Sequence, residues 1–123
     1  MDTPTAMSLT ITQTIQDQRP VLVLSGELDA GTAPHLADAA LAIVDQGVRD
    51  VIIETSGLTL CDSTGLSVFV HVAGRLRAQA GRLALVAPSD AVRRALDTGG
   101  LAHAFVVAPT VAGAIYAIFR DHP

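Results

Sequence analysis

The sequence predicts an α/β domain in which a mixed, mostly parallel sheet of about five strands packs against about four helices. Short β-branched or leucine-rich runs alternate along the 123 residues with stretches whose apolar residues recur at helical spacing. No internal repeat or linker-like stretch divides this series, and its length suits one domain. Right-handed crossovers would make most of the sheet parallel, with an initial hairpin at one edge.

The beginning of the chain predicts a flexible arm followed by a β-hairpin. Residues 1–7 are small and polar, so we expect a flexible N-terminal arm ahead of a single domain at residues 8–123. Near-alternation of apolar and polar residues from Leu9 to Ile15 predicts a half-buried strand. After a polar break, the apolar run at residues 21–24 predicts a buried strand that pairs with the first in antiparallel fashion.

A helix and a central strand are expected next. Residues 32–46 carry apolar residues at helical spacing, with Thr32 as the expected N-cap and Gly47 as the expected end. The β-branched run at residues 51–53 predicts the central strand. A turn is expected at residues 56–57.

The second helix is expected to begin within residues 62–65 and to end at Gly81. Its predicted apolar stripe consists of Leu66, Phe69, Val70, Ala73 and Leu76. A fourth strand follows at residues 83–86.

The last part of the chain predicts two further helices around a fifth strand at residues 105–107. Ser89 is the expected cap of the third helix, which should stop at residues 99–100, and Thr110 is the expected cap of the fourth. The fourth helix is expected to run through Ala114, Ile115, Ile118 and Phe119.

Composition excludes several classes of function. The net charge is −4, so no basic patch is expected to bind nucleic acid. All eight basic residues are arginine, which excludes a lysine-dependent phosphate loop and a lysine Schiff base. The single cysteine excludes an intramolecular disulfide and a thiolate metal cluster, and the histidines lack ligand-like spacing. We therefore expect no cofactor and no metal.

Hydropathy favours a cytoplasmic protein that does not enter the membrane. The longest apolar runs, such as residues 104–108, are far too short to cross a bilayer. Residues 1–5 lack the basic start and apolar segment of a signal peptide.

The segment from Glu54 to Leu66 carries the strongest functional signal, because it joins the central strand to a helix N-terminus. Unpaired backbone N–H groups and the helix dipole favour an anionic group there. Asp62 would cap the helix, and Ser63 would lie in its first turn with the hydroxyl outward. Gly65, lacking a side chain, would let a partner's backbone approach. The purely structural alternative is that these residues only cap and pack the helix.

A serine hydrolase is the enzymatic alternative for this segment. The sequence around Ser63 is not the Gly-x-Ser-x-Gly elbow. The candidate bases are His35, His71, His103 and His122, and no spacing brings any of them to Ser63 with an orienting acid.

Other polar residues admit both a functional and a structural role. Glu27, Asp29 and Glu54 are expected at strand ends, where carboxylates perform acid–base chemistry or only solvate loops. Cys61 lies in an apolar position and is expected to be a buried, inert thiol. The arginines at residues 93–94 are expected on a solvated helix face, with partner contact as the alternative.

Three segments together resemble one family. Residues 25–29 followed by Thr32, then residues 56–66, and then residues 92–101 resemble the STAS domain of bacterial anti-sigma factor antagonists. The similarity extends over about residues 8–120, with the segments in the same order and spacing. It implies a STAS-type sandwich.

The resemblance also implies a function without catalytic activity. Such a protein binds an anti-sigma factor that is also a serine kinase, and thereby releases a sigma factor. The kinase would phosphorylate Ser63 and weaken the complex, and a serine phosphatase would restore it. The implied partner-binding residues are Asp29, Asp62, Ser63, Thr64 and Gly65. The alternative is a non-switching STAS scaffold or accessory subunit of a signalling or transport complex.

The sequence departs from the family pattern at three places. Glu54 replaces the usual aspartate or asparagine, Thr64 replaces a second serine, and two glycines at residues 99–100 replace one. Thr64 leaves a second hydroxyl that a kinase could use. The edge hairpin leaves room for pairing, so we expect a monomer or a weak homodimer.

Overall fold

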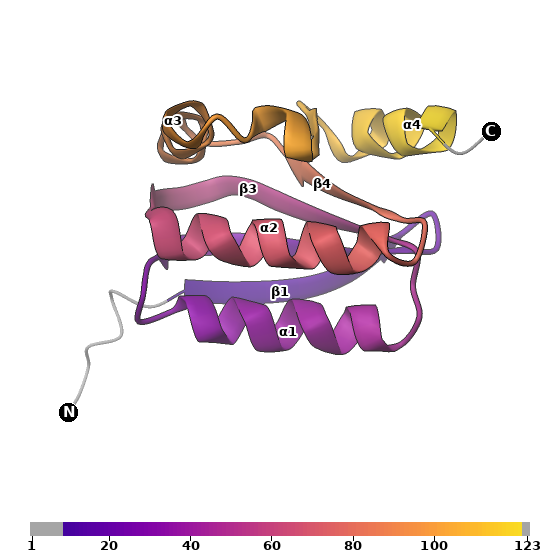
Figure 1. Cartoon of the computed structure of the whole chain (residues 1–123), viewed down its shortest axis with the longest axis horizontal. Helices are drawn as coiled ribbons and strands as arrows, with labels where there is room; N and C mark the ends of the chain where they lie inside the picture. The colour runs from indigo at the N-terminus through magenta and orange to yellow at the C-terminus, as the bar shows by residue number, and fades with distance from the viewer. Residues whose placement is uncertain (1–8, 122–123) are drawn as a thin grey trace.

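The computed structural model describes residues 9–121, so the predicted arm at residues 1–7 lies outside the described residues. The elements follow the order β1 Leu9–Gln16, β2 Arg19–Leu28, α1 Ala33–Asp45, β3 Asp50–Cys61, α2 Ser63–Arg77, β4 Arg82–Val86, α3 Asp90–Gly99, the 3-10 helix η2 Ala102–Ala104, β5 Val106–Ala108 and α4 Val111–Asp121. Strands and helices alternate after the first hairpin, as the hydrophobic pattern predicts (Figure 1).

The sheet has the spatial order β1-β2-β3-β4-β5, with β1 antiparallel to β2 and the other neighbours parallel. The predicted mixed sheet with an edge hairpin is therefore confirmed. Figure 1 shows α1 and α2 running side by side over one face. Buried residues of α1, α2 and α3 pack on that face, whereas Ala114 and Ile118 of α4 pack on the other.

The predicted turn at residues 56–57 is wrong, because β3 continues through it to Cys61. The register between β2 and β3 shifts twice along this stretch, which lets the irregular strand remain paired. A Cβ at Gly57 would lie 2.7 Å from the Leu24 carbonyl oxygen, so the close approach of β2 requires a glycine. Glu54 is consequently in the middle of a strand, and its predicted place at a strand end is corrected.

Three large apolar residues of the predicted strands and helices are exposed. Ile15 is 73% exposed, because only the beginning of the edge strand, at Leu9 and Ile11, contacts the core. Phe119 is 65% exposed, and Val70 of α2 is also exposed. On α2 the core position belongs instead to the fully buried Val72.

The helix ends follow the predicted chemistry at most positions. Ser89 accepts a hydrogen bond from the Val92 N–H, and Thr110 accepts one from the Gly113 N–H. Helix α2 ends at Arg77, before the predicted Gly81. Thr32 holds the N-cap position of α1, but its hydroxyl does not cap that helix. Among the residues described, no helix is long and apolar enough to cross a membrane.

Candidate functional site

The candidate site forms where β2 and β3 end side by side. Leu28 and Cys61, the last residues of these strands, are partners in the register. The Asp62 N–H donates to the Leu28 carbonyl oxygen at 3.2 Å, which joins the loop after β2 to the start of α2. The loops that carry Asp29 and Asp62 therefore emerge from the same edge of the sheet, as parallel pairing requires.

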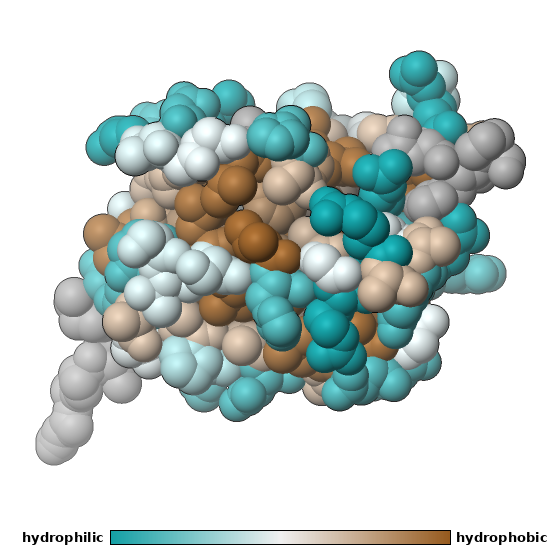
Figure 2. All heavy atoms as spheres, viewed as in Figure 1, coloured by the Kyte–Doolittle hydropathy of each residue, from teal (hydrophilic) through white to brown (hydrophobic). Residues whose placement is uncertain are grey.

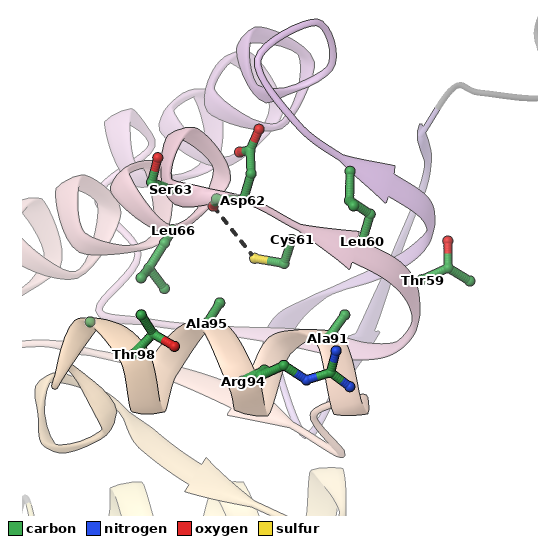
Figure 3. A pocket seen from close by; sticks show the side chains of 11 residues that line it. Thr59, Leu60, Cys61, Asp62, Ser63, Leu66, Ala91, Arg94, Ala95 and Thr98 are labelled. Carbon is green, nitrogen blue, oxygen red and sulfur yellow. Dashed lines mark hydrogen bonds between the residues drawn. The ribbon is translucent and has the colours of Figure 1, made fainter.

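Asp62 is the N-cap of α2. Its backbone is extended, and its Oδ1 accepts a hydrogen bond of 3.0 Å from the Gly65 N–H. Ser63 is the first residue of the helix, and both Ser63 and Thr64 are exposed. Figure 3 shows the Ser63 hydroxyl and the Asp62 carboxylate directed away from α3. The predicted cap and the predicted outward hydroxyl are both present.

Gly65 plays a different part from the one expected. It is buried, and an ideal Cβ at this position would lie 2.5 Å from Cγ of Leu28. The missing side chain thus lets the start of α2 approach β2 of the same chain, rather than leaving room for a partner's backbone. This packing sets the height of Ser63 above the sheet edge.

The Asp29 carboxylate organises its own loop. Its Oδ1 accepts hydrogen bonds from the Gly31 N–H at 2.9 Å and from the Thr32 N–H at 3.1 Å. The Thr32 hydroxyl donates to the Glu27 carbonyl oxygen at 2.7 Å, and the Asp29 N–H donates to that hydroxyl at 3.0 Å. The residue following β2 is therefore held at the site by the loop, and its side chain stays partly exposed.

A groove of about 420 Å³ separates the start of α2 from α3 (Figure 3). Its inner wall includes Leu66 and Ala95, and hydrophobic surface is visible between the two helices in Figure 2. Asp62 and Ser63 form one rim, and Arg94 of α3 lies on the opposite side.

The sequence places Arg94 on a solvated helix face with partner contact as the alternative, but it does not predict that this residue lies at the groove beside Ser63. Within residues 9–121 the Arg94 guanidinium makes no hydrogen bond or ion pair, and the exposed side chain presents its charge to the solvent at the groove. The solvated face predicted for residues 93–94 is correct, but the sequence contained no sign that α3 packs beside Ser63.

Cys61 lines the same groove as a free thiol. Burial, followed by the negative charge of Asp62, raises the pKa of its thiol to about 11. The thiol consequently stays protonated at neutral pH. This agrees with the predicted inert cysteine, although the side chain is only half-buried.

Within residues 9–121, no histidine hydrogen-bonds to the Ser63 hydroxyl as the general base of a hydrolase would. His71 is the candidate on the same helix, but it lies eight residues further, about 12 Å along the axis. His35 is an exposed residue of α1, and His103 is exposed in η2. His122 lies outside the described residues. No cluster of three or more metal-ligating side chains occurs within residues 9–121.

Comparison with known proteins agrees with this architecture. The chain is 32% identical over 95 residues to an anti-sigma-B factor antagonist of Staphylococcus aureus, which covers 77% of this chain and 88% of that protein. The crystal structure of an anti-sigma factor antagonist from Mycobacterium paratuberculosis matches with a TM-score of 0.82 and 30% identity, over 90% of this chain and 94% of that one.

A further solved relative is the anti-sigma factor antagonist SpoIIAA. Its unphosphorylated form matches with a TM-score of 0.77 and 25% identity, over 90% of this chain and 97% of that one. Its phosphorylated form, from Bacillus, matches with a TM-score of 0.70 at the same identity, over 89% of this chain and 99% of that one. The model of the STAS domain family matches residues 8–114. Because this match covers most of the sequence and the fold agrees, the chain belongs to the STAS domain family.

Proposed function

We propose that this protein is an anti-sigma factor antagonist that binds a serine-kinase anti-sigma factor and is switched off by phosphorylation at Ser63. A serine phosphatase returns it to the binding state, and the cycle takes place in the cytoplasm, where sigma factors act. The observation that carries the proposal is the exposed Ser63 hydroxyl at the first residue of α2, beside an open groove. The family and the names of the relatives support the same function.

The partner surface consists of the rim and walls of this groove. Leu66 and Ala95 supply apolar contact inside the groove. Arg94 supplies a positive charge on the α3 side, and the Asp62 carboxylate lies on the α2 rim, directed away from α3. Such an arrangement fits a partner element with an apolar centre and both a basic and an acidic side chain. Thr64 and the loop of Asp29 extend the surface toward α1, and Gly65 contributes through its packing on Leu28.

Phosphorylation at this position separates binding from folding. A phosphate adds about −1.5 to −2 charges at pH 7, and the N-terminus of α2 stabilises negative charge. The domain should therefore remain folded. The same phosphate lies beside the Asp62 carboxylate, so a partner would meet excess negative charge and three solvated oxygens on this rim. A loss of about 2.8 kcal/mol would weaken the complex about a hundredfold.

The test is phosphorylation by the anti-sigma kinases of the source organism with ATP, followed by intact mass and site mapping. We expect one phosphate, located on Ser63, with no incorporation in Ser63→Ala. Thr64→Val is the matched control, because it removes the neighbouring hydroxyl and should still be phosphorylated. Absence of phosphate from the wild-type protein, or equal phosphorylation of Ser63→Ala, contradicts the proposal.

The second candidate is a STAS scaffold or accessory subunit without a switch. Its supporting observation is that Asp62 caps α2 and Gly65 packs on Leu28 whether or not Ser63 is modified. Affinity purification under native conditions separates the two candidates. Recovery of a kinase anti-sigma factor that is lost with Ser63→Asp supports the switch, whereas recovery of a transport or scaffold complex unaffected by Ser63→Asp supports the alternative.

A further inference from the structure

The outer edge of β1 is a second feature built for association. β1 pairs with β2 along all eight of its residues, and within residues 9–121 no strand lies on its other side. A strand edge presents alternating N–H and C=O groups, which another strand satisfies most completely. The edge lies two strands away from β3, which leads to Ser63.

The hairpin turn determines which backbone groups point outward. Asp17 and Gln18 both have positive φ, as in a two-residue type I′ turn, and Gln16 is the partner of Arg19. Residues that flank such a turn exchange both hydrogen bonds, and hydrogen-bonded pairs then recur at every second residue. The N–H and C=O groups of Gln16, Thr14 and Thr12 thus face β2.

The intervening residues of β1 therefore direct their N–H and C=O groups away from the sheet. These outward residues are Ile11, Gln13 and Ile15. They form a regular ladder of donors and acceptors along an exposed strand.

The usual protections against edge pairing are absent from this strand. β1 contains no charged residue, no proline and no glycine, and its register with β2 has no bulge. The adjacent turn is locally neutral, because Arg19 and Asp17 form an ion pair of 3.3 Å. Two chains with a net charge of −4 each can therefore meet here without placing like charges opposite each other.

We propose that a second copy of this chain pairs with β1 in antiparallel fashion about a two-fold axis at Gln13. In a continuous sheet, residues that lie opposite each other in the two copies must point to the same face. A two-fold axis that passes between the two copies of one residue meets this condition. In this register each Ile15, 73% exposed in the single chain, lies opposite the half-buried Ile11 of the other copy. Thr12 lies opposite Thr14, a favourable cross-strand pair.

Self-pairing accounts for the exposed edge of both chains at once. The two-fold arrangement covers Ile15 of each copy. It also provides hydrogen-bond partners for the outward N–H and C=O groups of residues 11, 13 and 15 in both chains. The dimer is a continuous sheet that leaves both Ser63 hydroxyls exposed. It neither requires nor excludes the phosphorylation switch.

Cysteine cross-linking tests the axis directly, in a Cys61→Ala background. Gln13→Cys places two thiols opposite each other, so mild oxidation should convert most of the protein to a disulfide-linked dimer. Thr12→Cys is the matched control, since each thiol would face Thr14 of the other copy and should cross-link far less. Cross-linking at residue 12 in preference to residue 13 overturns the register.

Charge tests the dimer itself in the protein without cysteine changes. Sedimentation at increasing concentration should reveal a monomer–dimer equilibrium in the wild type. Gln13→Lys places two lysines face to face, and we expect the dimer dissociation constant to rise about tenfold or more. Gln46→Lys makes the same charge change at the end of α1 and should leave that constant nearly unchanged. A wild-type monomer at all concentrations, or equal effects of the two lysines, overturns the proposal.

Discussion

Replacing Gly65 with alanine tests how the start of α2 is positioned. The new methyl group would lie 2.5 Å from Cγ and 2.8 Å from Cδ2 of Leu28, well inside van der Waals contact. Leu28 is fully buried and cannot turn aside freely. Overpacking of this kind costs about 1–3 kcal/mol, while alanine recovers about 0.5–1 kcal/mol of helix propensity. We expect the free energy of unfolding to fall by about 1–2 kcal/mol, measured by urea denaturation.

Gly74 of the same helix supplies the matched control. It is exposed, and a Cβ built there meets nothing within 4 Å. Gly74→Ala should therefore raise the free energy of unfolding by about 0.5–1 kcal/mol. If Gly65→Ala were as stabilising as Gly74→Ala, that result would contradict the close packing of Gly65 against Leu28. In the double variant Gly65→Ala/Leu28→Ala, the loss of unfolding free energy should be smaller than the sum of the losses in the two single variants. The smaller residue at position 28 makes room for the new methyl group.

Three further predictions concern the same segment. Asp62→Ala removes the acceptor for the Gly65 N–H and should lower the free energy of unfolding by about 1 kcal/mol, whereas Asp62→Asn should retain most of it. Cys61 should react slowly with a disulfide reagent at pH 8, and its reaction rate should increase as the pH rises through about 11. In Asp62→Asn this increase in rate should occur at a lower pH. Fast labelling of the wild type at pH 8 argues against burial of the thiol. Ser63→Asp should change the free energy of unfolding by less than about 0.5 kcal/mol while weakening partner binding, as denaturation and calorimetry would measure.

Much of the fold follows from local patterns in the sequence. The alternation from Leu9 to Ile15, the buried run at residues 21–24 and the β-branched residues 51–53 locate three neighbouring strands. Asp62 and Ser89 identify helix starts because a short polar side chain before an apolar run is a cap by its chemistry. These features depend on a few consecutive residues, so a single sequence is sufficient to predict them.

Features that depend on distant contacts escaped prediction. The continuation of β3 past Ser56 needs the close approach of β2 at Gly57, and the sequence alone reads as a turn there. Gly65 looks like an open surface until Leu28 is placed against it.

The role of Arg94 also depends on tertiary structure. It becomes part of the site only because α3 packs beside the start of α2, with Leu66 and Ala95 between them. The groove results from the packing of two helices, so no local sequence motif predicts it.

Under the proposed function, Ser63 controls the affinity of this domain for a kinase anti-sigma factor. The most direct measurement is the dissociation constant of that complex before and after stoichiometric phosphorylation, with the circular dichroism spectrum recorded for both forms. We expect an unchanged fold and an affinity weakened about a hundredfold, with recovery after phosphatase treatment. Equal affinity of the phosphorylated and unphosphorylated forms would contradict it.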